Sequence, residues 1–213
     1  MRPIASITAG LLAVASLCAA QETPARILKK IEQHIQGRGA VRIEFSETYQ
    51  WKLIGEEHTT AGTLLLKGHD RFRVETPDQV IVSDGKSIWT FSRPSNRVVI
   101  DVFRNNDNTL LPRKVFLEYT KEYRAVLKGE QSVEGTPCYL VLFTDDTGEK
   151  MFPSVRVWVD KEVFIPKKIE QTDLSGNVTV FTLSSFVTDV ETDNTDFTFT
   201  VPEGADVIDL RTL

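Results

Sequence analysis

The residues of this chain that could carry out chemistry are few and scattered. The three histidines, His34, His58 and His69, are widely spaced, and no pair stands at a spacing typical of metal ligands. No CxxC, HExxH or GxSxG pattern occurs, so neither a zinc site nor an activated nucleophile is indicated. We therefore expect a protein that is not an enzyme and that uses no metal and no cofactor.

Two polar turns and one cysteine could still suggest a site. Asp145 and Asp146, with Glu149, could hold calcium weakly, but calcium loops usually supply more oxygen ligands, which favours a solvated turn. The stretch Asp84-Gly85-Lys86 lacks the glycine-rich approach of a phosphate loop and predicts a hairpin turn. Cys138 lies in the apolar run CYLVLF, which favours a small buried hydrophobic residue over a nucleophile.

Residues 1–20 have the pattern of a secretory signal peptide. Arg2 supplies a positive charge, and the apolar run that follows is too short for a comfortable membrane span and ends in small residues. We expect cleavage before Gln21, which would leave residues 21–213 as a single exported domain in the periplasm. The alternative is a lipoprotein that is acylated on Cys18.

Length and charge restrict the class of protein further. The 213 residues suit one domain. A net charge of −5 and a pI of about 5.3 argue against nucleic-acid binding, which requires a basic surface. Cys138 would be the single cysteine of the cleaved chain, so the fold must be held by its apolar core rather than by a disulfide.

An amphipathic helix is predicted over residues 24–36, where Ile27, Leu28, Ile31 and Ile35 stand at helical spacing. After this helix, apolar residues recur at every second position, which is the period of a strand.

Residues 41–53, VRIEFSETYQWKL, alternate between apolar and polar side chains and predict a long half-buried strand. Glu47 is the one charge at the apolar positions, where a carboxylate needs a partner or water. Further strands follow between short turns, which predicts an antiparallel meander. These strands are expected over residues 59–67, 72–75, 79–82, 87–92, 97–102, 123–133, 137–144, 154–160, 164–173, 178–187 and 197–201.

A sheet of about eleven strands must curl into a barrel or part of one. Such a sheet encloses more volume than its own side chains readily fill, and large aromatic side chains are spread over its thin strands. An ordinary core remains the alternative for any single residue. The whole set favours an apolar cavity, with short helices over residues 105–120 as its lid.

The stretch TPDQVIVSDGKSIWTF, residues 76–91, is the most specific motif in the chain. Together with the motifs around it, it resembles the periplasmic outer-membrane lipoprotein carrier family, the LolA-like proteins. The supporting motifs are the amphipathic first helix, FSETYQW, GTLLLKG, RFRVE, residues 96–101, LLPRKVFLEY, VWVD, IPKKIEQTDLSGN and FTFTVPEGADVIDL.

The resemblance implies an α+β, mainly β fold: a single-domain, incomplete and highly curved antiparallel β-barrel of about 11 strands, closed by short lid helices. Its cavity would receive the acyl chains of a lipoprotein, with no cofactor and no covalent step. The partners would be an inner-membrane ABC transporter as donor and an outer-membrane lipoprotein as acceptor. We expect a monomer that binds no nucleic acid.

Strand alternation and the resemblance together nominate a ligand-binding surface. The residues expected on the cavity or its lid are Ile43, Phe45, Tyr49, Trp51, Leu64, Leu66, Phe72, Val74, Val80, Val82, Trp89, Phe91 and Phe116. Family members often carry a lid-holding arginine after the strand that here reads LLLK, where this chain has Gly68. Arg71 is the candidate replacement. Which side chains of the later strands face the cavity stays open.

Other functions stay open at this stage. A periplasmic module that senses lipids or lipoproteins would usually carry a second domain. A carrier of another lipid is also compatible with the cavity. A lipid or glycan hydrolase is the third possibility, but nothing in the sequence nominates its nucleophile.

Overall fold

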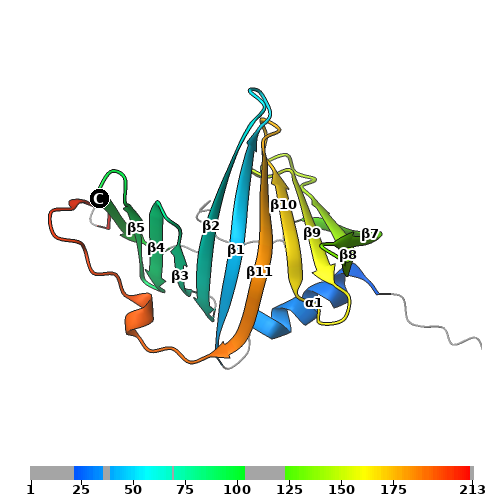
Figure 1. Ribbon diagram of the computed structural model, residues 1–213, viewed down its shortest axis with the longest axis horizontal. Helices are drawn as coiled ribbons and strands as arrows, with labels where there is room; N and C mark the ends of the chain where they lie inside the picture. The colour runs from blue at the N-terminus through cyan, green and yellow to red at the C-terminus, as the bar shows by residue number, and fades with distance from the viewer. Residues whose placement is uncertain (1–21, 36–38, 69, 104–122, 212–213) are drawn as a thin grey trace, which may run out of the picture.

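The computed structural model of the protein describes residues 22–35, 39–68, 70–103 and 123–211, and these form one large sheet with a helix against it (Figure 1). The helix is α1 (Pro24–Ile35), and a short 3₁₀ helix, η1 (Thr195–Phe197), lies near the C-terminus. The strands are β1 (Ala40–Trp51), β2 (Glu56–Lys67), β3 (Arg71–Glu75), β4 (Gln79–Asp84), β5 (Ser87–Ser92), β6 (Arg97–Val102), β7 (Arg124–Val133), β8 (Thr136–Thr144), β9 (Ser154–Asp160), β10 (Pro166–Thr172), β11 (Val178–Val190) and β12 (Asp206–Asp209). The expected signal peptide and the expected lid helices lie outside the described residues.

The strands follow the order β12-β6-β5-β4-β3-β2-β1-β11-β10-β9-β8-β7. All neighbours in this order are antiparallel except β12, which runs parallel to β6. The outermost strands, β12 and β7, are not paired with each other, so the sheet curls without closing. The expected mainly β, unclosed barrel is confirmed, with twelve strands in the described residues rather than about eleven.

The sheet consists of two meanders joined along β1 and β11. Arg42 pairs with Val187 and Gln50 with Val178, so the first strand of the chain joins one of the last. A Cβ atom on Gly39, just before β1, would lie only 2.4 Å from the Cα atom of Asp189. Glycine is therefore required where the backbone enters this pairing.

Helix α1 begins at Pro24 because Thr23 caps it. The backbone N–H of Arg26 donates to Thr23 Oγ1 at 3.3 Å, and that of Ile27 donates to the Thr23 carbonyl at 3.0 Å. Ile27 and Ile31 are buried against the sheet, as their helical spacing predicts. We call the face of the sheet that carries α1 the inner face, and the opposite face the outer face.

The outer face is covered in part by the chain that follows β11, which runs past β3, β4 and β5 in orange and red in Figure 1. Phe197 is buried there with Ala40 and Leu65, and the ring of Phe199 lies 5.7 Å from that of Phe91. The strand predicted over residues 197–201 is therefore wrong. Its alternating aromatic residues anchor a segment that has no strand neighbour, and the last strand forms later, as β12.

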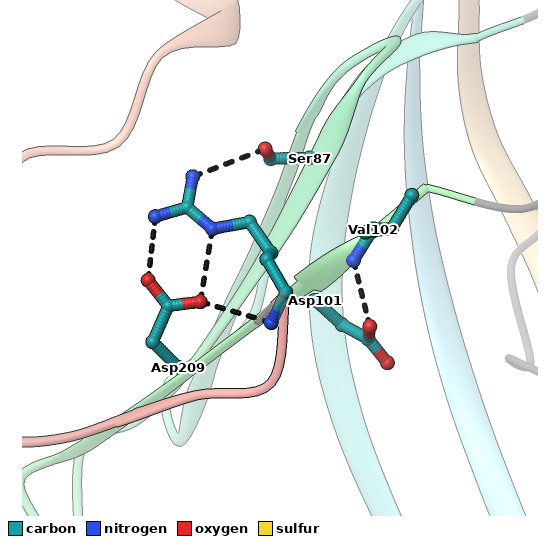
Figure 2. A network of polar contacts seen from close by, with 5 residues as sticks. Ser87, Asp101, Val102 and Asp209 are labelled. Atoms are coloured by element: carbon teal, nitrogen blue, oxygen red, sulfur yellow. Dashed lines mark hydrogen bonds and ion pairs between the residues drawn. The ribbon is translucent and has the colours of Figure 1, made fainter. Parts of the chain in front are cut away.

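Arg211 fastens the end of this segment to the sheet (Figure 2). Its Nε and Nη2 atoms donate to the two carboxylate oxygens of Asp209 at 2.9 and 2.6 Å, and its Nη1 atom donates to Ser87 Oγ at 3.3 Å. The hydrogen bonds that Asp209 accepts from Arg211 lower the pKa of its carboxyl to about 2. Beside them, the carboxylate of Asp101 accepts the backbone N–H of Val102 at 2.7 Å.

Candidate functional site

The inner face carries buried apolar side chains where β1, β2 and β11 lie side by side. Ile43 and Phe45 of β1 are buried there, and the ring of Phe45 meets that of Phe181 edge to face, with the ring centres 6.0 Å apart. Gly62 lies directly across from Phe45 on β2. A Cβ atom on Gly62 would lie 2.6 Å from Phe45 Cζ, so the absence of a side chain there makes room for the ring.

The buried apolar side chains of this face form one continuous cluster, which we call the inner-face cluster. It combines Ile27 and Ile31 of α1 with side chains from β1 to β5 and from β8 to β11. The described residues thus place apolar surface from both meanders beneath a single helix.

Six of the thirteen sequence-predicted ligand residues lie in this cluster. They are Ile43, Phe45, Leu64, Leu66, Phe72 and Val74. Tyr49 and Trp51 follow on the same face of β1, towards its end, where Tyr49 is half-buried and Trp51 is exposed. Phe116 lies outside the described residues.

The structure does not bring the other four predicted residues to the inner face. Val80, Val82 and Phe91 form a separate buried cluster with Val98 and Ile100 of β6, and Trp89 packs against it. The C-terminal segment covers this cluster through Phe199. These four residues therefore belong to the core of the outer face.

The pairing of β3 with β4 explains this division. Val74 pairs with Ile81 and Phe72 pairs with Ser83, so Ile81 faces inward and its neighbours Val80 and Val82 face outward. The run Val80-Ile81-Val82 is apolar on both faces, and its sequence alone does not reveal which face is which.

Arg71 also lies on the outer face. Its Nη1 atom donates to Asn194 Oδ1 at 3.4 Å, and its guanidinium carbon lies 5.7 Å from the centre of the Phe197 ring. The described contacts of Arg71 are thus with the C-terminal segment. The lid that Arg71 was expected to hold lies outside the described residues.

The inner-face residues of the later strands were not predicted from the sequence. Val141 and Phe143 of β8, with Val155 and Val157 of β9, are buried in the inner-face cluster. The alternation in SVRVWVD carries this signal for β9, since Arg156 separates Val155 from Val157.

A groove of about 570 Å³ opens beside this cluster, between α1 and β7. Leu28, Tyr123 and Ala125 supply its apolar lining and also pack against the cluster, while Lys29 and Glu32 add polar groups. Its volume falls within the range of about 300–1,000 Å³ that is typical of small-molecule sites. The groove gives the apolar inner face an opening to solvent.

Glu47 lies at an inner-face position of β1, and its titration is clearly perturbed. Burial raises the pKa of the Glu47 carboxyl, and the nearby charge of His58 opposes the shift. Thr179 and Gln171 lie on the same part of the sheet and are buried. Among the residues that the structure describes, no three histidine, cysteine or acidic side chains gather as metal ligands would.

The other candidate sites of the sequence have structural roles. Cys138 is buried with Leu140 and Trp158, and burial raises the pKa of its thiol. Asp145 accepts hydrogen bonds from the hydroxyl and the backbone N–H of Thr147, which help to lower its pKa to about 2. The turn at Asp145 is therefore held by its own carboxylate, as a solvated turn would be.

Comparison with known proteins places the chain near lipoprotein carriers. A model of the outer membrane lipoprotein carrier protein LolA family matches residues 36–200. The outer-membrane lipoprotein carrier protein of Alkalilimnicola ehrlichii is 27% identical over 75% of this chain and 77% of its own length. An uncharacterised protein of Methanocaldococcus jannaschii is 24% identical over 88% of this chain. The chain spans 54% of that relative's length, or about half.

Among solved structures, an uncharacterised conserved protein from Thermus thermophilus is similar with a TM-score of 0.58. The two chains are 16% identical, and the match covers 87% of this chain and 98% of the other. At this identity the likeness concerns the fold alone. Within the described ranges, no helix is long and apolar enough to cross a membrane.

Proposed function

Because the chain belongs to the outer membrane lipoprotein carrier protein LolA family, we propose that it binds the acyl chains of lipoproteins on its inner face and carries them through the periplasm. Members of this family are binding or carrier proteins rather than enzymes. The observation that carries the proposal is the inner-face cluster, which gathers apolar side chains from both meanders beneath one helix on an unclosed sheet.

The physical chemistry of an acyl chain requires such a surface. Burying one CH₂ group away from water is favourable by about 0.8 kcal/mol of free energy, so a lipoprotein with several acyl chains cannot cross an aqueous compartment unshielded. We propose that the predicted residues of the inner-face cluster contact the chains, together with the cluster residues of β8 and β9. Val80, Val82, Trp89 and Phe91 are then excluded from the ligand site, because they face the C-terminal segment.

The carrier must also release its cargo, and the attachment of α1 suits this requirement. The helix lies on the sheet through Ile27 and Ile31 without joining a strand ladder. The Lys30 ammonium lies 2.9 Å from a Glu22 carboxylate oxygen and 3.6 Å from the centre of the Phe164 ring. A shift of α1 would break the Lys30–Phe164 contact but no strand pair, so the groove beside α1 is the proposed route for the chains.

The partners of this proposal follow from the family. The donor would be an inner-membrane ABC transporter, the acceptor an outer-membrane lipoprotein, and the carrier a monomer without a cofactor. ATP used by the donor and a higher affinity at the acceptor would set the direction of transfer.

Binding to a synthetic triacylated lipopeptide tests the proposal. Native mass spectrometry of the protein, purified from periplasm without detergent, should detect a one-to-one complex with the lipopeptide. Ala125→Trp should fill the groove and weaken binding about tenfold, which corresponds to the loss of about two buried CH₂ groups. Ala61→Trp is the matched control, because Ala61 is exposed on the outer face of β2.

Equal lipopeptide affinity of the two variants would contradict the groove as the binding site. Binding of phospholipid alone, with no lipopeptide complex, would leave an apolar binding site but assign it to another lipid. Circular dichroism and thermal unfolding of both variants would establish that each is folded.

A further inference from the structure

Four large apolar side chains lie exposed together at one end of the sheet. In the β1–β2 turn Leu53 is 95% exposed and Ile54 is 60% exposed, and Trp51 just before them is 39% exposed. In the neighbouring β10–β11 turn Leu174 is 72% exposed. We call these four residues the apolar tip. Figure 1 shows the two turns side by side at the top of the molecule, at the far end of β1 and β11 from α1.

The two turns are joined and ordered by hydrogen bonds. The backbone N–H of Lys52 donates to Asn177 Oδ1 at 3.1 Å, and Asn177 is held in turn by Asp173 through two bonds of 2.9 Å. The backbone N–H of Gly55 donates to the Trp51 carbonyl at 2.9 Å. Several backbone groups of the two turns thus have partners inside the protein, which lowers the cost of moving these turns out of water.

The shape and size of the apolar tip favour a lipid bilayer over a protein partner. A stable protein interface buries about 800 Å² on each side and uses about 20–30 residues. Four side chains on two protruding turns offer much less than this, whereas the interface of a bilayer needs no matching surface. Trp51 packs edge to face on Tyr49, with ring centres 4.5 Å apart, and tryptophan and tyrosine are the side chains that concentrate at the membrane–water interface. We propose that the apolar tip inserts shallowly into the interfacial region of a phospholipid bilayer.

The charges around the tip determine which bilayer it fits. The structure describes both tip turns and the adjoining strand ends, and Lys52 is the one cationic residue among them. The acidic residues Glu56, Glu57 and Asp173 outnumber it. The whole chain carries a formal net charge of −5. Contact with the bilayer must then come from apolar side chains rather than from attraction to anionic lipids. This interaction does not depend on whether the inner face binds acyl chains.

Flotation with vesicles of pure phosphatidylcholine tests the proposal. The protein should float with the vesicles, and Leu53→Glu should lower the partition coefficient at least about tenfold, because it removes an inserted side chain and adds a charge. Val163→Glu is the control of matched charge, since Val163 is a 49% exposed apolar residue in the turn at the other end of β10. This control should leave flotation unchanged.

Two further measurements separate the tip from other modes of binding. Raising the salt concentration should not weaken flotation, and adding phosphatidylglycerol should not strengthen it. Ala125→Trp should float like the wild type, and Leu53→Glu should bind the lipopeptide like the wild type, so failure of one proposal is distinguishable from failure of the other.

Several results would overturn the proposed insertion. They are the absence of flotation, equal flotation of the wild type and Leu53→Glu, and flotation that requires anionic lipid and disappears with salt. A defined protein complex that Leu53→Glu disrupts, in the absence of flotation, would assign the tip to a protein partner instead.

Discussion

Replacing Gly62 by alanine should destabilise the protein, because the new methyl group would meet a buried ring. The Cβ atom would lie 2.6 Å from Cζ and 3.0 Å from Cε2 of Phe45, and 2.9 Å from the carbonyl oxygen of Glu75. The ring is buried and packs on Phe181 with 6.0 Å between centres, so it cannot move without disturbing the inner-face cluster.

The magnitude follows from two opposing terms. Adding a methyl group to a well-packed core costs about 1–3 kcal/mol. Alanine is favoured over glycine inside a strand by about 0.5–1 kcal/mol, and Gly62 has no positive φ that would forbid a side chain. The net loss in the free energy of unfolding should therefore be about 0–2.5 kcal/mol.

Chemical denaturation at 25 °C measures this loss directly. The midpoint should fall with an unchanged m-value, and the melting temperature should fall by up to about 10 °C for a domain of this size.

A double-mutant cycle with Phe45→Leu tests the stated cause. Leucine lacks the Cζ and Cε atoms that the new methyl group meets, so in this background Gly62→Ala should cost clearly less than in the wild type, with the contact to the Glu75 carbonyl remaining. If Gly62→Ala cost as much in the Phe45→Leu background as in the wild type, the ring would not be the cause. The contact with the Glu75 carbonyl would then explain the loss.

Three further predictions concern pH and the outer face. Glu47→Gln should raise the free energy of unfolding at neutral pH, because burial raises the pKa of the Glu47 carboxyl above 4.5, so the folded state loses stability as pH rises through the folded pKa. The advantage of the variant should fade below pH 4.5, and an undiminished advantage in acid would contradict this account. Asp145→Asn should flatten the loss of stability that the wild type shows as pH falls from 3.8 towards 2, since the lowered pKa of Asp145 stabilises the fold only while the carboxylate is ionised. Equal slopes in acid denaturation of the two proteins would argue against it. Phe197→Ala should cost about 3–5 kcal/mol and release the C-terminal segment to proteases, because the ring is buried on the outer face. An unchanged unfolding midpoint would show that the segment is not anchored by this ring.

Local patterns in the sequence predict most elements of this protein. A helical stripe predicts α1, and alternation with period two predicts β1. Short turns between successive strands leave few alternatives to antiparallel neighbours, so both meanders follow from local information.

Part of the candidate site can also be predicted from the sequence, where apolar and polar residues alternate along a strand. Phe72 and Val74 stand between the charged residues Arg71, Arg73 and Glu75, so their orientation is unambiguous. Such alternation exists only where one face of a strand is buried and the other meets water. Phe45, between Glu44 and Ser46, has the same property.

The tertiary structure alone decided the rest. The pairing of β1 with β11 joins opposite ends of the chain, and no local pattern specifies so distant a partner. The C-terminal segment buries the outer face of β4 and β5, so β4 has apolar side chains on both of its faces. Val80, Ile81 and Val82 therefore show no alternation of apolar and polar residues from which their orientation could be predicted. Only the register with β3 assigns Ile81 to the inner face. The apolar tip likewise became visible only when the pairing of β1 with β11 placed Leu174 beside the turn that carries Leu53.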